Sequence, residues 1–387
     1  MNRKIVWSLI ISLTIFSGWF AYKYFDTAIP LVNLSITMDK QQAEKEAIKV
    51  AQKHGWNLVD YDTAVTFQDD STLQAFTELE GGGKQAFIDM IKHNYHQPYV
   101  WQVRFYKEKE ISEYFVYFTP DGYQYGFMQK LPENEAGINI SKQQAQSVAE
   151  KEAVNWRVEL KNYKLLEYEQ QVQPGNRVDH AFVYQRHDIA LNKGLYRMKI
   201  IVSGNKVTGL ERYVKIPDEF TRRYVQMYDA NKLIATLGQG IQAIFYLFII
   251  CLFALFFLHK RRYLLLDKHV KMMSVFASIV FFSALNKFPL IWNNYATNIS
   301  KFVFLIEYFG SVVMTTLLAT LFVGTLCLIV EGLDRYVFGK HIQFFKLWSV
   351  DTAASYTILE QTVLGYCFAF IKLGYAVGFS MLASSWG

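Results

Sequence analysis

Five long apolar stretches limit what this chain can fold into more than any other feature of its sequence. They cover residues 5–22, 233–258, 272–292, 302–330 and 358–382. A helix needs about 20 apolar residues to cross the hydrocarbon core of a bilayer, so each stretch is a candidate membrane span. Residues 23–232, between the first and second stretches, have the composition of a soluble domain. The sequence therefore predicts a multi-pass α-helical membrane protein with an inserted extracytoplasmic α+β region.

The first stretch has two interpretations. Arg3 and Lys4 precede it, as basic residues precede the apolar core of a secretory signal peptide. However, the bulky residues Trp19, Phe20 and Tyr22 stand where a cleavage site requires small side chains. We therefore expect residues 1–25 to form an uncleaved transmembrane anchor, with a cleaved signal peptide as the alternative.

Basic residues predict how the chain is oriented in the cell membrane. Arg3 and Lys4 flank the first stretch, and Lys260, Arg261 and Arg262 follow the second. Loops rich in lysine and arginine stay in the cytoplasm, so both groups are expected there. The two expectations agree if the N-terminus is cytoplasmic and residues 26–232 are extracytoplasmic. The loop 331–350 would then be cytoplasmic.

Composition excludes several other classes of protein. Hydrophobic residues make up 52% of the chain and charged residues 19%, against roughly 25% charged in an ordinary soluble domain. The net charge of +6 is too small to indicate a nucleic-acid partner. All three cysteines lie inside apolar stretches and form no Cys-x-x-Cys motif, which excludes a disulfide scaffold and a thiolate metal site. We expect no cofactor and no metal, and the lipid bilayer as a partner.

The extracytoplasmic region contains an internal repeat, over residues 36–132 and 138–216. Lys-Gln-Gln-Ala occurs at 40–43 and again at 142–145, preceded by the plausible helix N-caps Asp39 and Ser141. Alternating, aromatic-rich segments typical of strands follow each predicted helix, at 99–106, 112–118 and 123–129 and at 177–185, 194–203 and 206–215. We therefore expect one α+β unit over 26–136, a second over 137–232, and a four-helix membrane region over 233–387.

This pattern of one helix followed by an antiparallel meander resembles the PepSY and cystatin-like small domains found outside bacterial membranes. The resemblance rests on the repeated Lys-Gln-Gln-Ala segment and on the matching order of strands behind it. It implies that the two units bind or restrain a partner and carry no chemistry of their own. Such a partner would be an extracytoplasmic protein or peptide.

No catalytic or metal-binding motif of a known type is present in the soluble region. His93 and His96 have a spacing that could place both on one helix face, but no third ligand is evident and Pro98 would end the helix. We interpret them as surface histidines. The run of glycines at 81–83 has no strand before it and reads as a flexible loop. The aromatic side chains of 99–127 are expected to form the core of the sheet.

Charged residues inside the apolar stretches are more informative, because charge in hydrocarbon is costly and usually paired or functional. Glu307 and Lys372 both fall in the outer half of the membrane, and we expect them to form a structural pair. Glu360 falls at the inner end, near the depth of Arg335 and Lys340. A substrate or proton path is the alternative use of these charges. Small residues in the fifth stretch predict close helix packing, at Gly365, Ala369, Gly374, Ala376 and Gly378.

The whole arrangement resembles the N-terminal part of large bacterial CPBP-family proteins, intramembrane endopeptidases related to CAAX prenyl proteases. The similar features are the anchor, the segment 29–39 that opens the outer region, the repeated units, and the bundle entered after Arg261 and Arg262. The segment 330–336 also resembles a loop between early spans of that family. The resemblance implies a hydrolase whose catalytic signature is a double glutamate with a following arginine, plus histidines on later helices.

That signature is absent from residues 1–387. Glu331 and Arg335 have the spacing of a glutamate and its arginine, but Val330 occupies the position of the first glutamate. The segment also reads as a loop, and no histidine lies in the five stretches, so we assign no catalytic residue. Because the chain stops just beyond the fifth stretch, we expect a catalytic bundle to follow it. The expected function is therefore the sensing and scaffolding half of a CPBP-type protease. The alternative is a non-enzymatic membrane protein whose two extracytoplasmic PepSY-like units bind or inhibit a partner.

Overall fold

The computed structural model describes residues 3–29, 34–264, 266–339 and 349–385. The chain divides into two compact units. The helical unit takes its described residues from 1–33, 228–286 and 308–387, and the sheet unit comprises 34–227 and 287–307. The segment 287–307, which connects two long apolar helices, therefore belongs to the sheet unit.

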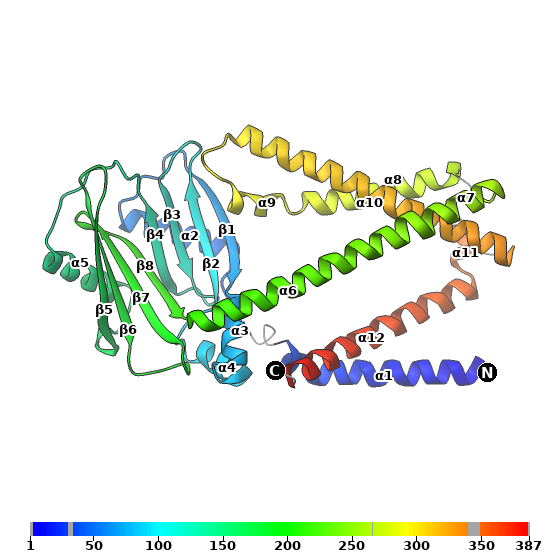
Figure 1. Ribbon diagram of the computed structural model, residues 1–387, viewed down its shortest axis with the longest axis horizontal. Coiled ribbons are helices and arrows are strands. Elements are labelled where there is room, and N and C mark those ends of the chain that lie inside the picture. The colour runs from blue at the N-terminus through cyan, green and yellow to red at the C-terminus, as the bar shows by residue number, and fades with distance from the viewer. Residues whose placement is uncertain (1–2, 30–33, 265, 340–348, 386–387) are drawn as a thin grey trace. The chain divides into compact units, whose positions relative to one another are not determined.

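Within the described residues, five helices are long and apolar enough to cross a membrane. They contain the five stretches that the sequence predicts as spans. Their elements are α1 (Arg3–Ala28), α6 (Asp218–Ala243) continuing through the π-helical turns Ile244–Cys251 into α7 (Leu252–Lys260), α8 (Leu266–Leu285), α10 (Lys301–Phe338) and α12 (Tyr356–Ser385). A short helix, α11 (Val350–Ala353), precedes α12 (Figure 1).

Helices α1 and α12 pack side by side and run in the same direction (Figure 1). Arg3 forms an ion pair with Glu360 at the start of both helices. Further along, a Cβ atom added to Gly374 would lie 2.7 Å from the Cβ atom of Ser17. This confirms the predicted close packing at Gly374, whereas Gly365 has no neighbouring atom within 4 Å of such a Cβ.

Helices α7, α8 and α10 also contact one another within the helical unit. Leu258, at the end of α7, is fully buried and packs with Ile329 of α10. A Cβ atom on Gly332 would lie 2.7 Å from a methyl group of Leu258. The absence of a side chain at Gly332 therefore lets α7 approach α10 closely near its C-terminal end.

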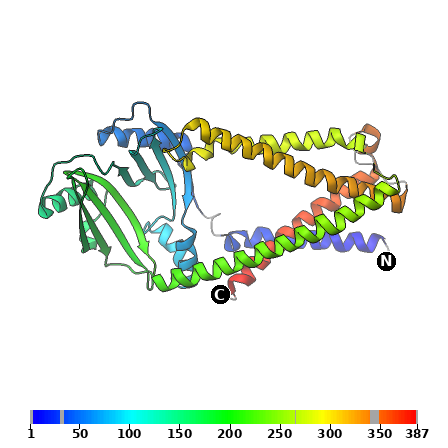
Figure 2. The ribbon, with the colours of Figure 1, turned by 45° about the horizontal axis from the view of Figure 1, so that its top comes forward.

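The sheet unit contains one antiparallel sheet of eight strands, in the order β1-β2-β3-β4-β8-β7-β6-β5 (Figures 1 and 2). The first repeat supplies β1 (Asp62–Asp69), β2 (Tyr99–Tyr106), β3 (Glu113–Phe118) and β4 (Gln124–Lys130). The second supplies β5 (Tyr163–Val172), β6 (Val178–Arg186), β7 (Leu195–Ser203) and β8 (Lys206–Lys215). The repeats meet where β4 pairs with β8, at Phe127–Leu210 and Met128–Gly209 only.

Each repeat begins with a helix that packs on the same face of the sheet. Helices α2 (Lys40–Lys53) and α5 (Lys142–Asn155) have the predicted N-caps Asp39 and Ser141, both in capping boxes. Alanines of both helices, including Ala47 and Ala149, are fully buried against the sheet. The two repeats therefore share one hydrophobic core.

The first repeat departs from the prediction between β1 and β2. Two short helices stand there, α3 (Ser71–Leu79) and α4 (Gly83–Lys92). Gly81 and Gly82 lie in the loop between α3 and α4, but the loop prediction is wrong for Gly83, which is the first residue of α4. Gly82 has a φ of 115°, a left-handed conformation that glycine adopts without strain, so it allows the tight turn from α3 into α4.

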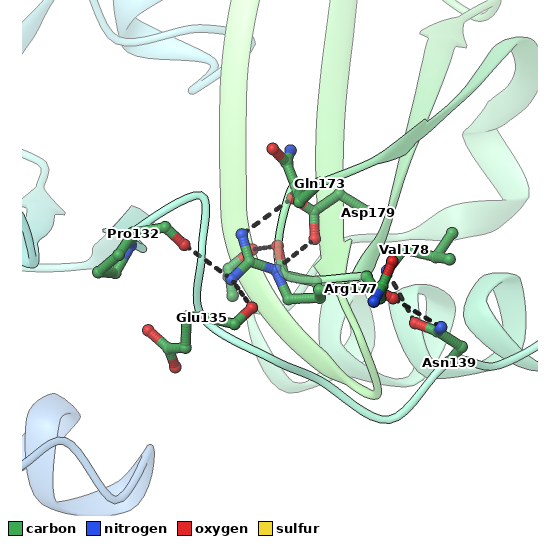
Figure 3. A network of polar contacts seen from close by, with 10 residues as sticks. Pro132, Glu135, Asn139, Gln173, Arg177, Val178 and Asp179 are labelled. Carbon is green, nitrogen blue, oxygen red and sulfur yellow. Dashed lines mark hydrogen bonds and ion pairs between the residues drawn. The ribbon is translucent and has the colours of Figure 1, made fainter.

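The chain between β4 and α5 links the two repeats. This linker is held to the hairpin that joins β5 and β6 (Figure 3). Arg177 is 4% exposed and forms an ion pair with Asp179 at 2.9 Å. Its Nη1 atom donates hydrogen bonds to the carbonyl oxygens of Pro132 and Glu135, both at 3.0 Å. Because these acceptors belong to the linker, Arg177 holds the second repeat to the chain that leaves the first.

Candidate functional site

The helical unit contains a buried cluster of three ionisable residues. His269 lies on α8, and Glu331 and Arg335 lie one turn apart on α10. The Nε2 atom of His269 is 2.7 Å from Oε2 of Glu331, and Nη2 of Arg335 is 2.7 Å from Oε1. The His269 and Glu331 side chains are each 3% exposed. The cluster therefore joins the start of α8 to the end of α10.

This cluster corrects two predictions. Residues 331–338 are not a loop, because α10 continues as helix to Phe338. A histidine does lie in a candidate span, since the third described span, which includes most of α8, begins at His269. The charges and the glycine of this segment resemble loop composition, but burial of Glu331 against His269 and packing of Gly332 on Leu258 stabilise helix instead.

The geometry of the cluster favours a structural role for Glu331. One of its carboxylate oxygens faces Arg335 and the other faces His269, so both are engaged within the protein. The described residues contain no group of three or more His, Cys, Asp and Glu side chains placed to hold a metal ion. The His269 contact joins α8 to α10, whereas the Arg335 contact lies within α10.

The structure gives Glu360 a partner that the sequence analysis did not name. Glu360 forms its ion pair with Arg3 and accepts a hydrogen bond from Nε1 of Trp7 at 3.0 Å. The sequence placed Arg335 and Lys340 at a similar depth in the membrane to Glu360. Arg335 forms its ion pair with Glu331 instead, and Lys340 lies outside the described residues. The charge of Glu360 therefore fastens α12 to α1.

Glu307 and Lys372 occupy helices α10 and α12, respectively. Both side chains are exposed. Their pairing stays a prediction, as does the alternative that either belongs to a substrate or proton path.

In the sheet unit, Arg104 on β2 anchors the segment 287–307. Arg104 is 6% exposed, and its Nε atom is 2.6 Å from a carboxylate oxygen of Glu113 on β3. Its Nη1 atom donates a hydrogen bond to the carbonyl oxygen of Asn293 at 3.1 Å. One buried guanidinium therefore bonds both the sheet and the segment that leads from α8 to α10.

Further contacts hold the same segment to the edge of the sheet. Lys301, the first residue of α10, forms an ion pair with Asp62 of β1. The backbone N–H of Lys109 donates to the carbonyl oxygen of Thr297 at 2.7 Å. Tyr295 is 1% exposed and packs on Tyr106, with ring centroids 5.5 Å apart. No sequence pattern signals these contacts, because they join residues far apart in the chain.

His93 and His96 are not a surface pair. His93 is exposed at the end of α4, as predicted, whereas His96 is 6% exposed. The Nδ1 atom of His96 is 2.9 Å from the hydroxyl oxygen of Tyr125. Burial, with a smaller contribution from the charge of Arg212, lowers the pKa of His96 to about 3. His96 is therefore a neutral core residue.

The core interpretation of the aromatic strands is confirmed. The buried aromatic residues of this region include Tyr99, Phe105, Phe118, Tyr125 and Phe127. Phe105, Phe118 and Phe127 belong to one buried cluster and Tyr99 to a second, and both clusters pack helices onto the sheet.

Comparisons with known proteins add no assignment to these sites. No protein-family model, no curated protein and no solved structure matches the chain.

Proposed function

We propose that this chain is the sensing and scaffolding part of a membrane protease of CPBP type, without the catalytic residues of that family. The observation that carries the sensing role is the anchoring of segment 287–307 to the sheet by Arg104. That segment connects α8 to α10, so a change in the sheet alters the ends of two candidate spans. The protease assignment rests on the resemblance of the sequence.

The chemistry of Arg104 explains how a displacement of the sheet would reach the helices. The Arg104–Glu113 ion pair is buried, and the carbonyl of Asn293 takes up a further donor of the guanidinium. Detaching the segment would break the hydrogen bond from Arg104 to the Asn293 carbonyl, and a hydrogen bond to a charged group contributes about 1.5–3 kcal/mol. The segment 287–307 therefore moves with the sheet rather than detaching from it.

The proposed topology places the N-terminus in the cytoplasm and residues 26–232 outside it. Two features support this placement. Basic residues flank the first two spans on the proposed cytoplasmic side. Helices α1 and α12 run in the same direction, as the first and fifth spans of a five-span chain must. Glu360 would then meet Arg3 at the cytoplasmic end of both helices.

Sensing is tested by the reactivity of Cys327, which lies one turn before Glu331 on α10. The protein, with Cys251 and Cys367 replaced by alanine, is placed in liposomes and treated with N-ethylmaleimide. Arg104→Met should change the rate of Cys327 modification several-fold, because the buried contact between the sheet and the segment that leads into α10 is lost. Arg197→Met is the matched control, since Arg197 pairs with Glu167 on another part of the sheet.

Equal rates in native protein, Arg104→Met and Arg197→Met would contradict a sensing role. That result would favour the alternative, a non-enzymatic protein whose outer repeats bind or inhibit a partner. The protease assignment has its own test, the genomic reading frame beyond codon 387. A further apolar helix with Glu-Glu-x-x-x-Arg supports it, and an immediate stop codon contradicts it.

A further inference from the structure

A cationic cleft lies at the junction of the two repeats, on the face of the sheet that carries α5. Its volume is about 480 Å³. Arg212 of β8 and Arg157, just beyond α5, line it together with Tyr123 and Trp156. Because its walls come from both repeats, a ligand bound there would contact the two units at once.

Neither arginine of the cleft is neutralised by a carboxylate. Among the described residues, no Asp or Glu oxygen lies within ion-pair distance of Arg212 or Arg157. Arg212 donates from Nη2 to the carbonyl oxygen of Trp156 at 2.9 Å, while its buried Nε atom has no hydrogen-bond partner. Arg157 is exposed, with its guanidinium 6.0 Å from the ring centroid of Tyr123. Both side chains therefore keep donors for a ligand.

The last acidic residue of α5 already has hydrogen-bond partners. Glu152, one turn earlier on α5, accepts hydrogen bonds from Nε1 of Trp156 at 2.8 Å and Nδ2 of Asn155 at 2.9 Å. Three other acidic residues line a separate cleft of about 270 Å³, which also borders Arg212, namely Asp69, Asp70 and Glu211. The positive charge of Arg212 also contributes to the low pKa of His96. The cleft beside α5 is therefore suited to an anion.

Polar groups around the arginines favour a peptide over a simple ion. The side-chain amides of Asn94, Gln124 and Asn155 line the same cleft and can both donate and accept. The β4–β8 ladder has its last pair, Phe127–Leu210, on the side of the cleft. Extended peptides are commonly bound by strand edges and polar side chains together.

We infer that this cleft binds a carboxylate-bearing peptide segment on the extracytoplasmic side of the membrane. Arg212 and Arg157 bind the carboxylate, since guanidinium groups pair with it through two parallel hydrogen bonds. The inference rests on the proposed function and names the ligand class that the sensing unit would recognise. Binding between the repeats would adjust the β4–β8 junction, which only two residue pairs hold.

The test uses the full 387-residue protein in detergent and a fluorescein-labelled hexaglutamate peptide, with fluorescence anisotropy as the readout. Native protein should bind hexaglutamate and not hexaglutamine. Arg157→Gln and Arg212→Gln should each weaken binding about tenfold, as expected for loss of a charge-assisted hydrogen bond. Arg222→Gln is the matched control, because Arg222 is an exposed arginine of the same unit that does not line the cleft.

Arg157→Gln keeps the test decisive even if Arg212→Gln fails to fold, because the Arg157 side chain is exposed. The inference would be overturned if native protein did not bind hexaglutamate, or if Arg157→Gln and Arg222→Gln bound it equally. It would also be overturned if inorganic phosphate displaced the labelled peptide as effectively as unlabelled hexaglutamate does at the same concentration. None of these results affects the Cys327 experiment, which uses no peptide. The inference and the proposed function can therefore fail separately.

Discussion

The Nε2 atom of His269 lies 2.7 Å from a carboxylate oxygen of Glu331, and both side chains are buried. This contact joins the first turn of α8 to the last turns of α10. Arg335, one turn later on α10, contacts the other carboxylate oxygen of Glu331.

Removing the Glu331 carboxylate should destabilise the protein strongly. Glu331→Gln leaves the guanidinium of Arg335 without a counter-charge, which typically costs about 3–5 kcal/mol for a buried pair. Thermal unfolding of the detergent-solubilised protein measures the loss. The double variant Glu331→Leu/Arg335→Met should recover much of it, because no buried charge is then left unpaired. A double variant less stable than Glu331→Gln would contradict the structural role.

Arg177 and Arg186 offer a matched comparison of buried and exposed ion pairs. Each pairs with an aspartate two residues later in the chain, Asp179 and Asp188. The Arg177 side chain is 5% exposed and also bonds the inter-repeat linker, whereas the Arg186 and Asp188 side chains are 17% and 33% exposed. Arg177→Met should cost about 3–5 kcal/mol, and Arg186→Met about 0–1 kcal/mol.

Urea unfolding, followed by tryptophan fluorescence, measures both free energies. Equal losses in the two variants would show that Arg177 does not fasten the linker.

Packing between α1 and α12 should respond to the two glycines of α12 in opposite ways. Gly374→Ala places a methyl group 2.7 Å from the Cβ atom of Ser17 and 2.9 Å from its carbonyl oxygen, so the helices must separate. Such overpacking costs about 1–3 kcal/mol. Gly365→Ala meets no atom within 4 Å and should raise stability by about 0.5–1 kcal/mol through helix propensity. The melting temperatures of the two variants measure these effects. A lower melting temperature for Gly365→Ala than for the native protein would show that Gly365 also lies in a tight helix contact.

His96 should make stability depend on pH. Its folded-state pKa is lowered to about 3, while an unfolded histidine titrates near about 6.5. Below about pH 6.5 the unfolded chain therefore binds a proton that the native protein does not, and stability falls by about 1.4 kcal/mol per pH unit. Unfolding free energies at pH 7 and pH 5 should thus differ by about 2 kcal/mol more in native protein than in His96→Gln.

The comparison with His96→Gln isolates this effect from His54, whose pKa burial also lowers. An identical pH dependence in native protein and His96→Gln would contradict the neutral, buried state of His96.

Local sequence patterns predicted much of the fold, because capping, alternation and apolar length act over short distances. The helices that begin at Lys40 and Lys142 and the six predicted strands agree with the structure to within a residue or two. The edge strands β1 and β5 were missed. Strand β5 has little buried surface, so its alternation is weak.

The candidate sites were harder to predict, because they depend on contacts between distant residues. Glu360 forms an ion pair with Arg3 near the opposite end of the chain. Arg104 of β2 donates a hydrogen bond to the carbonyl oxygen of Asn293, which lies far away in the sequence. Helix α10 continues past Glu331 because burial of the ion cluster outweighs the loop-like composition of the segment. The spacing of four residues between Glu331 and Arg335 is typical of an ion pair on one face of a helix, so it could have predicted that the helix continues there.

The proposed function requires the repeated sheet unit to lie outside the cytoplasm. Labelling of intact cells with a membrane-impermeant maleimide, using protein whose native cysteines are alanine, measures this placement. Cysteines at Lys45 and Lys161, exposed in the first and second repeats, should react. A cysteine at Lys260, the last residue of α7, should react only after the cells are lysed. Labelling at Lys260 in intact cells, without labelling at Lys45 and Lys161, would contradict the account.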